Sequence, residues 1–352
     1  MQDKSGAQSG GRKQLGKIHC ASGDLLKSAC LCIVASFALE YARYVLHSSV
    51  GNEIDMSLSQ WIFLIILSVL WGGSFFFVGI AVDHVPALTL VLSRVALAAV
   101  ILVPIALVAG FRLPVHPYDW LMFAIMAVLN NIIPFSMITL GQTQIASGLA
   151  SVLNATTPLW AVLIAHAFTH DEKLTANKLS GVLVGIAGVA VLVGPDAMIG
   201  EMSSVQGMAC IIVATISYGF ASLWARRFRT TPPLVSAACQ LICSAVLLLP
   251  IALMVDKSWL LTWPPAHVSA AIAGLAVFST ALAYILFYHI LSVSGPTNAM
   301  LVTLLVPVSG ILLGTLFLDE TLAPQHIAGA FLIMVALIVF DGRLLRFRGS
   351  GV

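Results

Sequence analysis

The sequence predicts an all-α membrane protein with ten transmembrane helices arranged as two inverted five-helix repeats. Three observations support this prediction: the composition, ten long apolar segments and an internal repeat. Of the 352 residues, 59% are hydrophobic and 9% are charged, whereas soluble domains carry about 25% charged residues. This balance indicates that lipid surrounds most of the chain. The formal net charge of +2 is too small to suggest a nucleic-acid partner.

The second observation is a series of ten apolar segments, each long enough to cross a bilayer that requires about 20 residues in a helix. These segments are uniformly apolar, whereas the strands of a membrane barrel alternate in polarity and are about 10 residues long. Helices are therefore expected. The predicted spans are 59–80, 87–109, 118–139, 145–169, 175–194, 205–224, 233–254, 267–291, 296–318 and 323–341.

Residues 1–56 precede the first predicted span and form an extension outside the repeats. They contain six of the 17 Lys and Arg residues, and their one apolar run, residues 29–39, is too short to span a bilayer. No clean small-residue cleavage site follows this run, so the match to a signal peptide is poor. We expect a disordered or non-essential extension, with the functional chain beginning at Met56.

Basic residues in the joints between spans predict the orientation. If the functional chain starts in the cytoplasm, one basic residue, Lys257, lies in an outer joint, and nine lie on the cytoplasmic side. The positive-inside rule then puts both termini, including the basic tail 342–352, in the cytoplasm. One missed or extra span would invert every later joint, so the bias also supports the number ten. The nine residues are Arg112, Lys173, Lys178, Arg226, Arg227, Arg229, Arg343, Arg346 and Arg348.

The third observation is the internal repeat, which predicts domains at residues 57–196 and 203–341. Each unit has five spans, an odd number, so the two copies must have opposite orientations in the membrane. Many secondary transporters have this plan, with a substrate site near the midplane. Five residues recur at offsets of 147 to 149: Gly72, Pro86, Pro158, Glu172 and Gly181 correspond to Gly219, Pro233, Pro307, Glu320 and Gly329.

Segments 139–188 and 292–337 resemble the two copies of the EamA domain of the drug/metabolite transporter superfamily. The resemblance covers about residues 57–341 and implies a ten-helix metabolite carrier, often an exporter, with cytoplasmic termini. We expect the bacterial inner membrane as its location. Its motif residues are Pro158, Glu172 and Gly181 in the first copy and Pro307, Glu320, Gln325 and Gly329 in the second, together with WGGSFFFVGIA at residues 71–81 and the Ser93-Arg94 pair.

Polar side chains at matching depth in both copies are candidates for substrate contact. Asn130 and Asn131 lie in the middle of span three, before Pro134, and Thr280 with its neighbour Ser279 occupies the corresponding place in span eight. Unpaired polar groups are costly in a bilayer, so such positions are usually functional. We expect these residues to line a substrate cavity.

The two repeat-related prolines, Pro158 and Pro307, are also candidate cavity positions. Proline cannot donate a hydrogen bond to the carbonyl four residues earlier, which frees the carbonyls of Asn154 and Thr303. Helices broken in this way often contact substrate in transporters. The alternative is a kink used only for packing, in which the side chains of Asn154 and Thr303 satisfy the freed groups locally.

Aromatic residues give a further set of candidates. Trp71 and Tyr218 occupy equivalent positions in the two copies. Tyr284 and Tyr288 are four residues apart and continue the helix face of Thr280. Such a stripe suits a cavity for amino acids or other small organic solutes, although membrane interfaces and helix packing use the same side chains.

Two titratable residues inside the spans are candidates for charge recognition or coupling. Arg94 requires a partner, because an unpaired charge in the membrane is costly. The candidates are Asp83 in the preceding joint, a carbonyl at a helix C-terminus, or an anionic group of the substrate. His289 could carry a proton in coupled transport, or it could simply be hydrogen-bonded.

The leading functional hypothesis is a secondary transporter that exports a small polar metabolite, such as an amino acid, by alternating access. The alternatives are a multidrug or nucleotide-sugar-type carrier and a membrane scaffold without transport. An enzyme is not expected, because it would require clustered catalytic side chains at membrane depth. The expected partners are a small-molecule substrate and the lipid bilayer, without nucleic acid, cofactor or metal. The oligomeric state stays open.

Overall fold

The computed structural model describes residues 58–169, 176–193, 202–258, 261–299, 302–320 and 323–341. This part of the chain is almost entirely helical and contains no strand. Seven of its helices or continuous helical segments are long and apolar enough to cross a membrane, and three shorter apolar helices accompany them. Together they correspond to the ten predicted spans, and the all-α membrane fold is confirmed. One boundary differs, because the helix of span eight continues to Ala299 and that of span nine begins at Val302, not at residue 296. The extension 1–56, the tail 342–352 and Glu172 lie outside the described residues.

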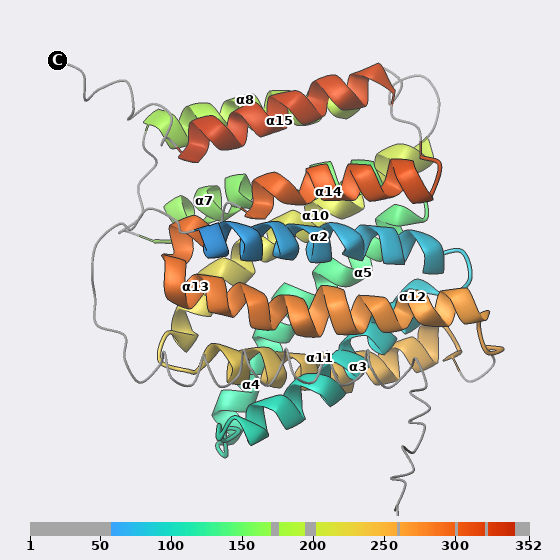
Figure 1. Ribbon diagram of the computed structural model, residues 1–352, viewed down its shortest axis with the longest axis vertical. Coiled ribbons are helices and arrows are strands. Elements are labelled where there is room, and N and C mark those ends of the chain that lie inside the picture. The colour runs from blue at the N-terminus through green and yellow to red at the C-terminus, as the bar shows by residue number, and fades with distance from the viewer. Residues whose placement is uncertain are drawn as a thin grey trace, which may run out of the picture. The chain divides into compact units, whose positions relative to one another are not determined.

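The helices of the first repeat begin with α2 and end with α8 (Figure 1). Proline residues mark several helix starts, because the fixed φ of proline suits the first turn and its missing N–H is not needed there. Span three is a long helix interrupted by a π-helical turn, and span four consists of two short helices. The bounds are α2 Leu58–Ala81, α3 Ala87–Val108, α4 Pro117–Ala127, η1 Val128–Ile132, α5 Ile133–Gln142, α6 Ser147–Asn154, α7 Thr157–Phe168 and α8 Ala176–Val193.

The helices of the second repeat follow the same order. Span eight, like span three, contains a π-helical turn between two α-helices. Span nine is a single helix, unlike its counterpart in the first repeat. The bounds are α10 Met202–Ala225, η2 Arg226–Phe228, α11 Pro233–Val255, α12 Ala266–Ala276, η4 Val277–Leu282, α13 Ala283–Ala299, α14 Val302–Phe317 and α15 Pro324–Asp341.

The packing of the helices follows the repeat. Helix α2 of the first repeat packs against α14 of the second, and the equivalent helix α10 packs against α7. In the same way, α4 contacts α11 while α12 contacts α3. Equivalent helices also contact each other directly, as α3 does with α11, α6 with α14 and α8 with α15. The last of these pairs runs along one edge of the helical bundle in Figure 1. These reciprocal contacts are those of two inverted copies packed together.

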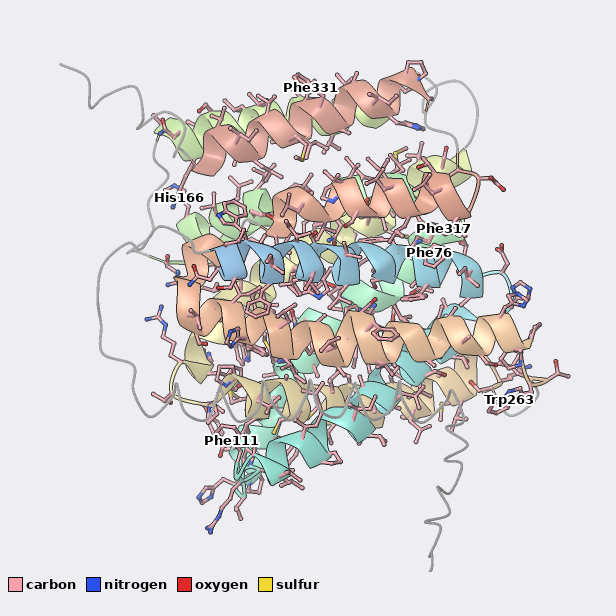
Figure 2. All side chains as sticks on the ribbon, viewed as in Figure 1. Phe76, Phe111, His166, Trp263, Phe317 and Phe331 are labelled. Carbon is pink, nitrogen blue, oxygen red and sulfur yellow. The ribbon has the colours of Figure 1, made fainter. Side chains whose placement is uncertain are left out.

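Large apolar side chains cover the outward faces of the helices. Val108 is 89% exposed, and Phe331 on α15 is 68% exposed and points away from the neighbouring helices in Figure 2. Soluble monomers rarely expose large contiguous apolar patches, whereas lipid accepts them at no cost. At one end of the α2–α14 contact, Phe76 and Phe317 meet edge to face with ring centroids 5.8 Å apart.

Glycines permit the closest helix crossings between the repeats. A Cβ atom on Gly72 of α2 would lie 2.8 Å from the backbone nitrogen of Gly310 in α14. The equivalent Gly219 of α10 faces α7, where a Cβ would lie 3.2 Å from the nitrogen of Ala161. Small residues of this kind let membrane helices approach until their backbones touch. The repeated Gly72 and Gly219 are therefore explained by matching helix crossings.

Candidate functional site

Both copies place their predicted polar pair in a π-helical turn. Asn130 and Asn131 lie in η1, and Thr280 and its neighbour Ser279 lie in η4. In the first copy Pro134 lies in the first turn of α5 and cannot bond to the carbonyl of Asn130, which is compatible with the wider turn. In the second copy the hydroxyl of Thr280 donates to the carbonyl of Leu275, 2.9 Å away. Turns of this type occur frequently at functional sites.

A network of amide and hydroxyl groups connects η1 to the second repeat. The Nδ2 group of Asn130 donates to Oε1 of Gln240 at 2.8 Å, and that of Asn131 donates to the Ser244 hydroxyl at 2.9 Å. The hydroxyl of Tyr284 donates to Oδ1 of Asn131 at 3.0 Å. We call these five residues the amide cluster. It joins η1, α11 and α13 in the interior of the bundle.

Gln240 and Ser244 were not among the predicted site residues. They lie one turn apart on α11, are 2% and 0% exposed, and the Ser244 hydroxyl also donates to the carbonyl of Gln240 at 2.6 Å. Their spacing of four residues in an otherwise apolar span puts them on one helix face, which is the signal that could have indicated them.

Arg94 lies beside the amide cluster in α3, and it is 6% exposed. Its Nε group donates to the hydroxyl of Thr280 at 2.9 Å, and its guanidinium carbon lies 3.6 Å from the centre of the Phe135 ring. The candidate partner Asp83 is exposed in the joint before α3 instead. We call Arg94, Phe135 and Thr280 the Arg94 subsite. Because Thr280 and Tyr284 are one turn apart, η4 and α13 connect this subsite with the amide cluster.

The predicted aromatic residues pack against two large apolar clusters, and Tyr218 contacts both of them. The rings of Tyr284 and Tyr288 are neighbours, with centroids 6.2 Å apart, and they pack against the apolar cluster that contains Phe135. Tyr218 packs against this cluster and also against the other large apolar cluster. Trp71 instead packs against Phe287, with ring centroids 5.2 Å apart, in the other large apolar cluster. Tyr218 therefore lies where the two apolar clusters meet, whereas Trp71 lies among apolar neighbours.

The proline positions of spans four and nine differ from each other. Helix α6 ends at Asn154, Pro158 lies in the first turn of α7, and the Thr157 hydroxyl donates to the freed carbonyl of Asn154 at 2.7 Å. The freed carbonyl is thus satisfied locally, while the buried side-chain oxygen of Asn154 has no hydrogen-bond partner among the described residues. Pro307 lies inside α14, which continues through it, because a membrane helix tolerates one missing hydrogen bond. Thr303 is half-buried near the start of α14.

His289 lies at the far end of the tyrosine stripe. Its ring meets Phe63 of α2 edge to face at 5.3 Å, and the hydroxyl of Ser292 donates to its carbonyl at 2.8 Å. His289 is the residue after Tyr288 on α13, and its ring meets α2. A role of His289 as a proton carrier in coupled transport stays a prediction.

Two carboxylates cap helix N-termini in the opposite repeat. Glu320, a residue of the family-like motif, accepts hydrogen bonds from the backbone nitrogens of Ser147 and Gly148 at 2.6 and 2.8 Å, at the start of α6. Asp256 accepts bonds from the backbone nitrogen and hydroxyl of Thr89 in α3 at 2.7 and 2.8 Å. Negative charge at a helix N-terminus satisfies free N–H groups and the helix dipole. We call these contacts the carboxylate caps.

The sequence profile of the EamA-like transporter family matches the chain twice, at residues 59–194 and 205–340. The chain belongs to the EamA-like transporter family. The two matched segments coincide with the two sets of helices described above. As an EamA-like transporter it is a multi-pass membrane protein that acts on a small-molecule substrate in a lipid environment.

Relatives of this EamA-like transporter carry transporter names. The chain is 26% identical over 285 residues to the uncharacterized inner membrane transporter YedA of Escherichia coli, covering 80% of this chain and 90% of that protein. It is 25% identical over 303 residues to a probable amino-acid metabolite efflux pump of Salmonella typhimurium, covering 81% and 95%. A crystal structure with 19% sequence identity superposes with a TM-score of 0.61, covering 84% of this chain and 100% of the other, and shows the same fold.

Proposed function

We propose that this protein is a secondary transporter that exports a small polar metabolite, such as an amino acid, by alternating access between its two repeats. The supporting observation is that the polar contacts of the site cross from one repeat to the other. Asn130 bonds to Gln240, Asn131 to Ser244 and Tyr284, and Arg94 to Thr280. A site divided between two inverted repeats changes when the repeats move relative to each other, as alternating access requires.

The proposed orientation has both termini in the cytoplasm, following the distribution of basic residues in the joints. In this orientation both carboxylate caps lie at the outer end of the bundle. Glu320 and Asp256 each connect the two repeats there, so opening of the outer end would have to break these contacts or carry the capped helices along. The bilayer proposed is the inner membrane, which is where YedA is named as a transporter.

The choice of an amino acid as the proposed solute rests on two arguments. The amide cluster offers both donors and acceptors at the interior of the bundle, which suits a solute with several polar groups. The similarity to a protein named as a probable amino-acid metabolite efflux pump supports the same class of solute.

Proteoliposomes containing the purified full chain test this function. Wild-type protein should move at least one member of an amino-acid panel across the bilayer faster than empty liposomes. Asn130→Ala should lower this rate roughly tenfold or more, because the variant loses the side chain that bonds to Gln240. Asn177→Ala is the matched control, since Asn177 is exposed at the start of α8 and its loss should leave the rate unchanged.

The proposal fails if correctly inserted wild-type protein moves no amino acid, sugar or drug above the background of empty liposomes. A panel in which only non-amino-acid solutes are moved would keep the transporter and replace its proposed substrate. Equal rates for the Asn130 and Asn177 variants and wild type would remove the amide cluster from the transport site.

A further inference from the structure

A buried arginine with no counter-charge among the described residues lies in the proposed transport site. Arg94 is 6% exposed, and a guanidinium stays charged in proteins. One of its five N–H groups, at Nε, donates to Thr280, and one face of the guanidinium lies on the ring of Phe135. Within the described part of the chain, the terminal Nη groups have no hydrogen-bond acceptor. Their four N–H groups are therefore available to a ligand.

The acidic residues whose side chains the structure describes lie in joints or at the ends of helices. Asp83 and Asp319 are exposed in joints, and Asp119 lies in the first turn of α4. Glu320 and Asp256 cap the starts of α6 and α3. Arg94 is the eighth residue of α3, about 10 Å along the helix from its first residue. A charge buried at that depth without a partner is costly in a membrane.

We infer that the transported solute carries a carboxylate, and that the Arg94 subsite binds it. This inference rests on the proposed transport function. A single fixed positive charge is balanced by a monoanionic group, and the paired Nη groups of an arginine match the two oxygens of a carboxylate. Thr280 and Phe135 hold Nε and one face of the guanidinium, which leaves the Nη groups free to meet the ligand. The cost of the buried charge then falls when the solute is bound.

The amide cluster extends the subsite toward the rest of the solute. Tyr284 lies one helical turn after Thr280, and its hydroxyl bonds to Asn131. The carbonyl oxygens of the amide side chains can accept hydrogen bonds from an ammonium or hydroxyl group. The chemical class expected is therefore a small monocarboxylate with a second polar group, such as an amino acid or a hydroxy acid.

Matched pairs of solutes in proteoliposomes test the inference on the full-length protein. Each pair consists of a monocarboxylate and its neutral amide or methyl ester. Wild-type protein should move the carboxylate roughly 10- to 100-fold more efficiently than its neutral partner, as expected for a charge-assisted pair. Arg94→Gln should abolish most of this preference. Arg94→Lys should keep part of it, because a lysine retains the charge without the paired donors.

Arg112→Gln provides the matched control. Arg112 is exposed in the joint between α3 and α4, so removing its charge should leave the preference at the wild-type level. A second measurement covers the case in which Arg94→Gln does not fold. In wild-type protein, the carboxylate should raise the apparent unfolding temperature while its neutral partner should not, and Thr280→Val should reduce this shift.

The results separate the two proposals. If wild-type protein moves both members of each pair equally, or if folded Arg94→Gln keeps the preference, the Arg94 subsite is overturned while the transport function stands. If chloride alone reproduces the stabilisation and no carboxylate adds to it, Arg94 is a structural anion site and the inference is again overturned. If wild-type protein moves no solute at all, the proposed function fails and the inference fails with it.

Discussion

Adjacent glycines in α2 allow a sharp test of the crossing between the repeats. A Cβ atom on Gly72 would lie 2.8 Å from the nitrogen of Gly310 and 2.9 Å from Cβ of Ser309. On Gly73 the nearest atom would be 3.8 Å away, which is ordinary van der Waals contact. Gly72→Ala must therefore push α2 and α14 apart by about half an ångström, whereas Gly73→Ala fits without movement. A gap of that size removes a quarter to a half of the local dispersion energy.

The expected loss for Gly72→Ala is about 1–3 kcal/mol from overpacking, of which the better helix propensity of alanine offsets up to about 1 kcal/mol. This corresponds to a fall in apparent unfolding temperature of about 2–8 °C. Gly73→Ala should match wild type or exceed it slightly. Both variants are heated in detergent at a fixed rate, and the folded fraction is measured by size-exclusion chromatography, since such unfolding is usually irreversible. Equal unfolding temperatures for the two alanine variants, or a lower one for Gly73→Ala, would refute the packing argument.

The same heating assay tests the carboxylate caps. Glu320→Ala removes two charge-assisted bonds to the start of α6 and should destabilise the protein by about 1–2 kcal/mol, whereas Asp319→Asn, at an exposed neighbour, should have little effect. Asp256→Ala removes two bonds to Thr89 and should cost a similar amount, with exposed Asp83→Ala as its control. Losses as large in the control variants as in the cap variants would contradict the assignment of these carboxylates as caps.

Much of the fold was predictable because a bilayer imposes strong rules on a sequence. Each span must be apolar for about 20 residues, and each buried polar group needs a reason to be there. The length rule gave ten spans that agree with the described helices. The polar rule singled out the pairs at Asn130 and Thr280, both of which lie in π-helical turns.

What the sequence did not predict depends on how helices lie against one another. Gln240 and Ser244 contribute to the site because α11 presents that face to η1, and the register of two helices cannot be read from either one alone. Asp83 was a candidate partner for Arg94 by closeness in sequence, yet the helix carries Arg94 about 10 Å away from the joint. The two prolines at matching positions behave differently, since α6 and α7 are separate helices whereas α14 is continuous through Pro307.

The two halves have similar backbones but unequal side chains at their shared centre. At the offset of 147 residues, Arg94 corresponds to Leu241, and at an offset of 149 residues the asparagine pair of η1 corresponds to Ser279 and Thr280. A homodimer of one repeat would carry two facing arginines that repel each other, whereas duplication within a single chain allows one copy to lose the charge. If the Arg94 subsite binds a carboxylate as proposed, a charge on one side only would fix which end of the solute lies against α3. A solute held in this way would cross the bilayer without tumbling, because its charged end stays on the same helix from loading to release.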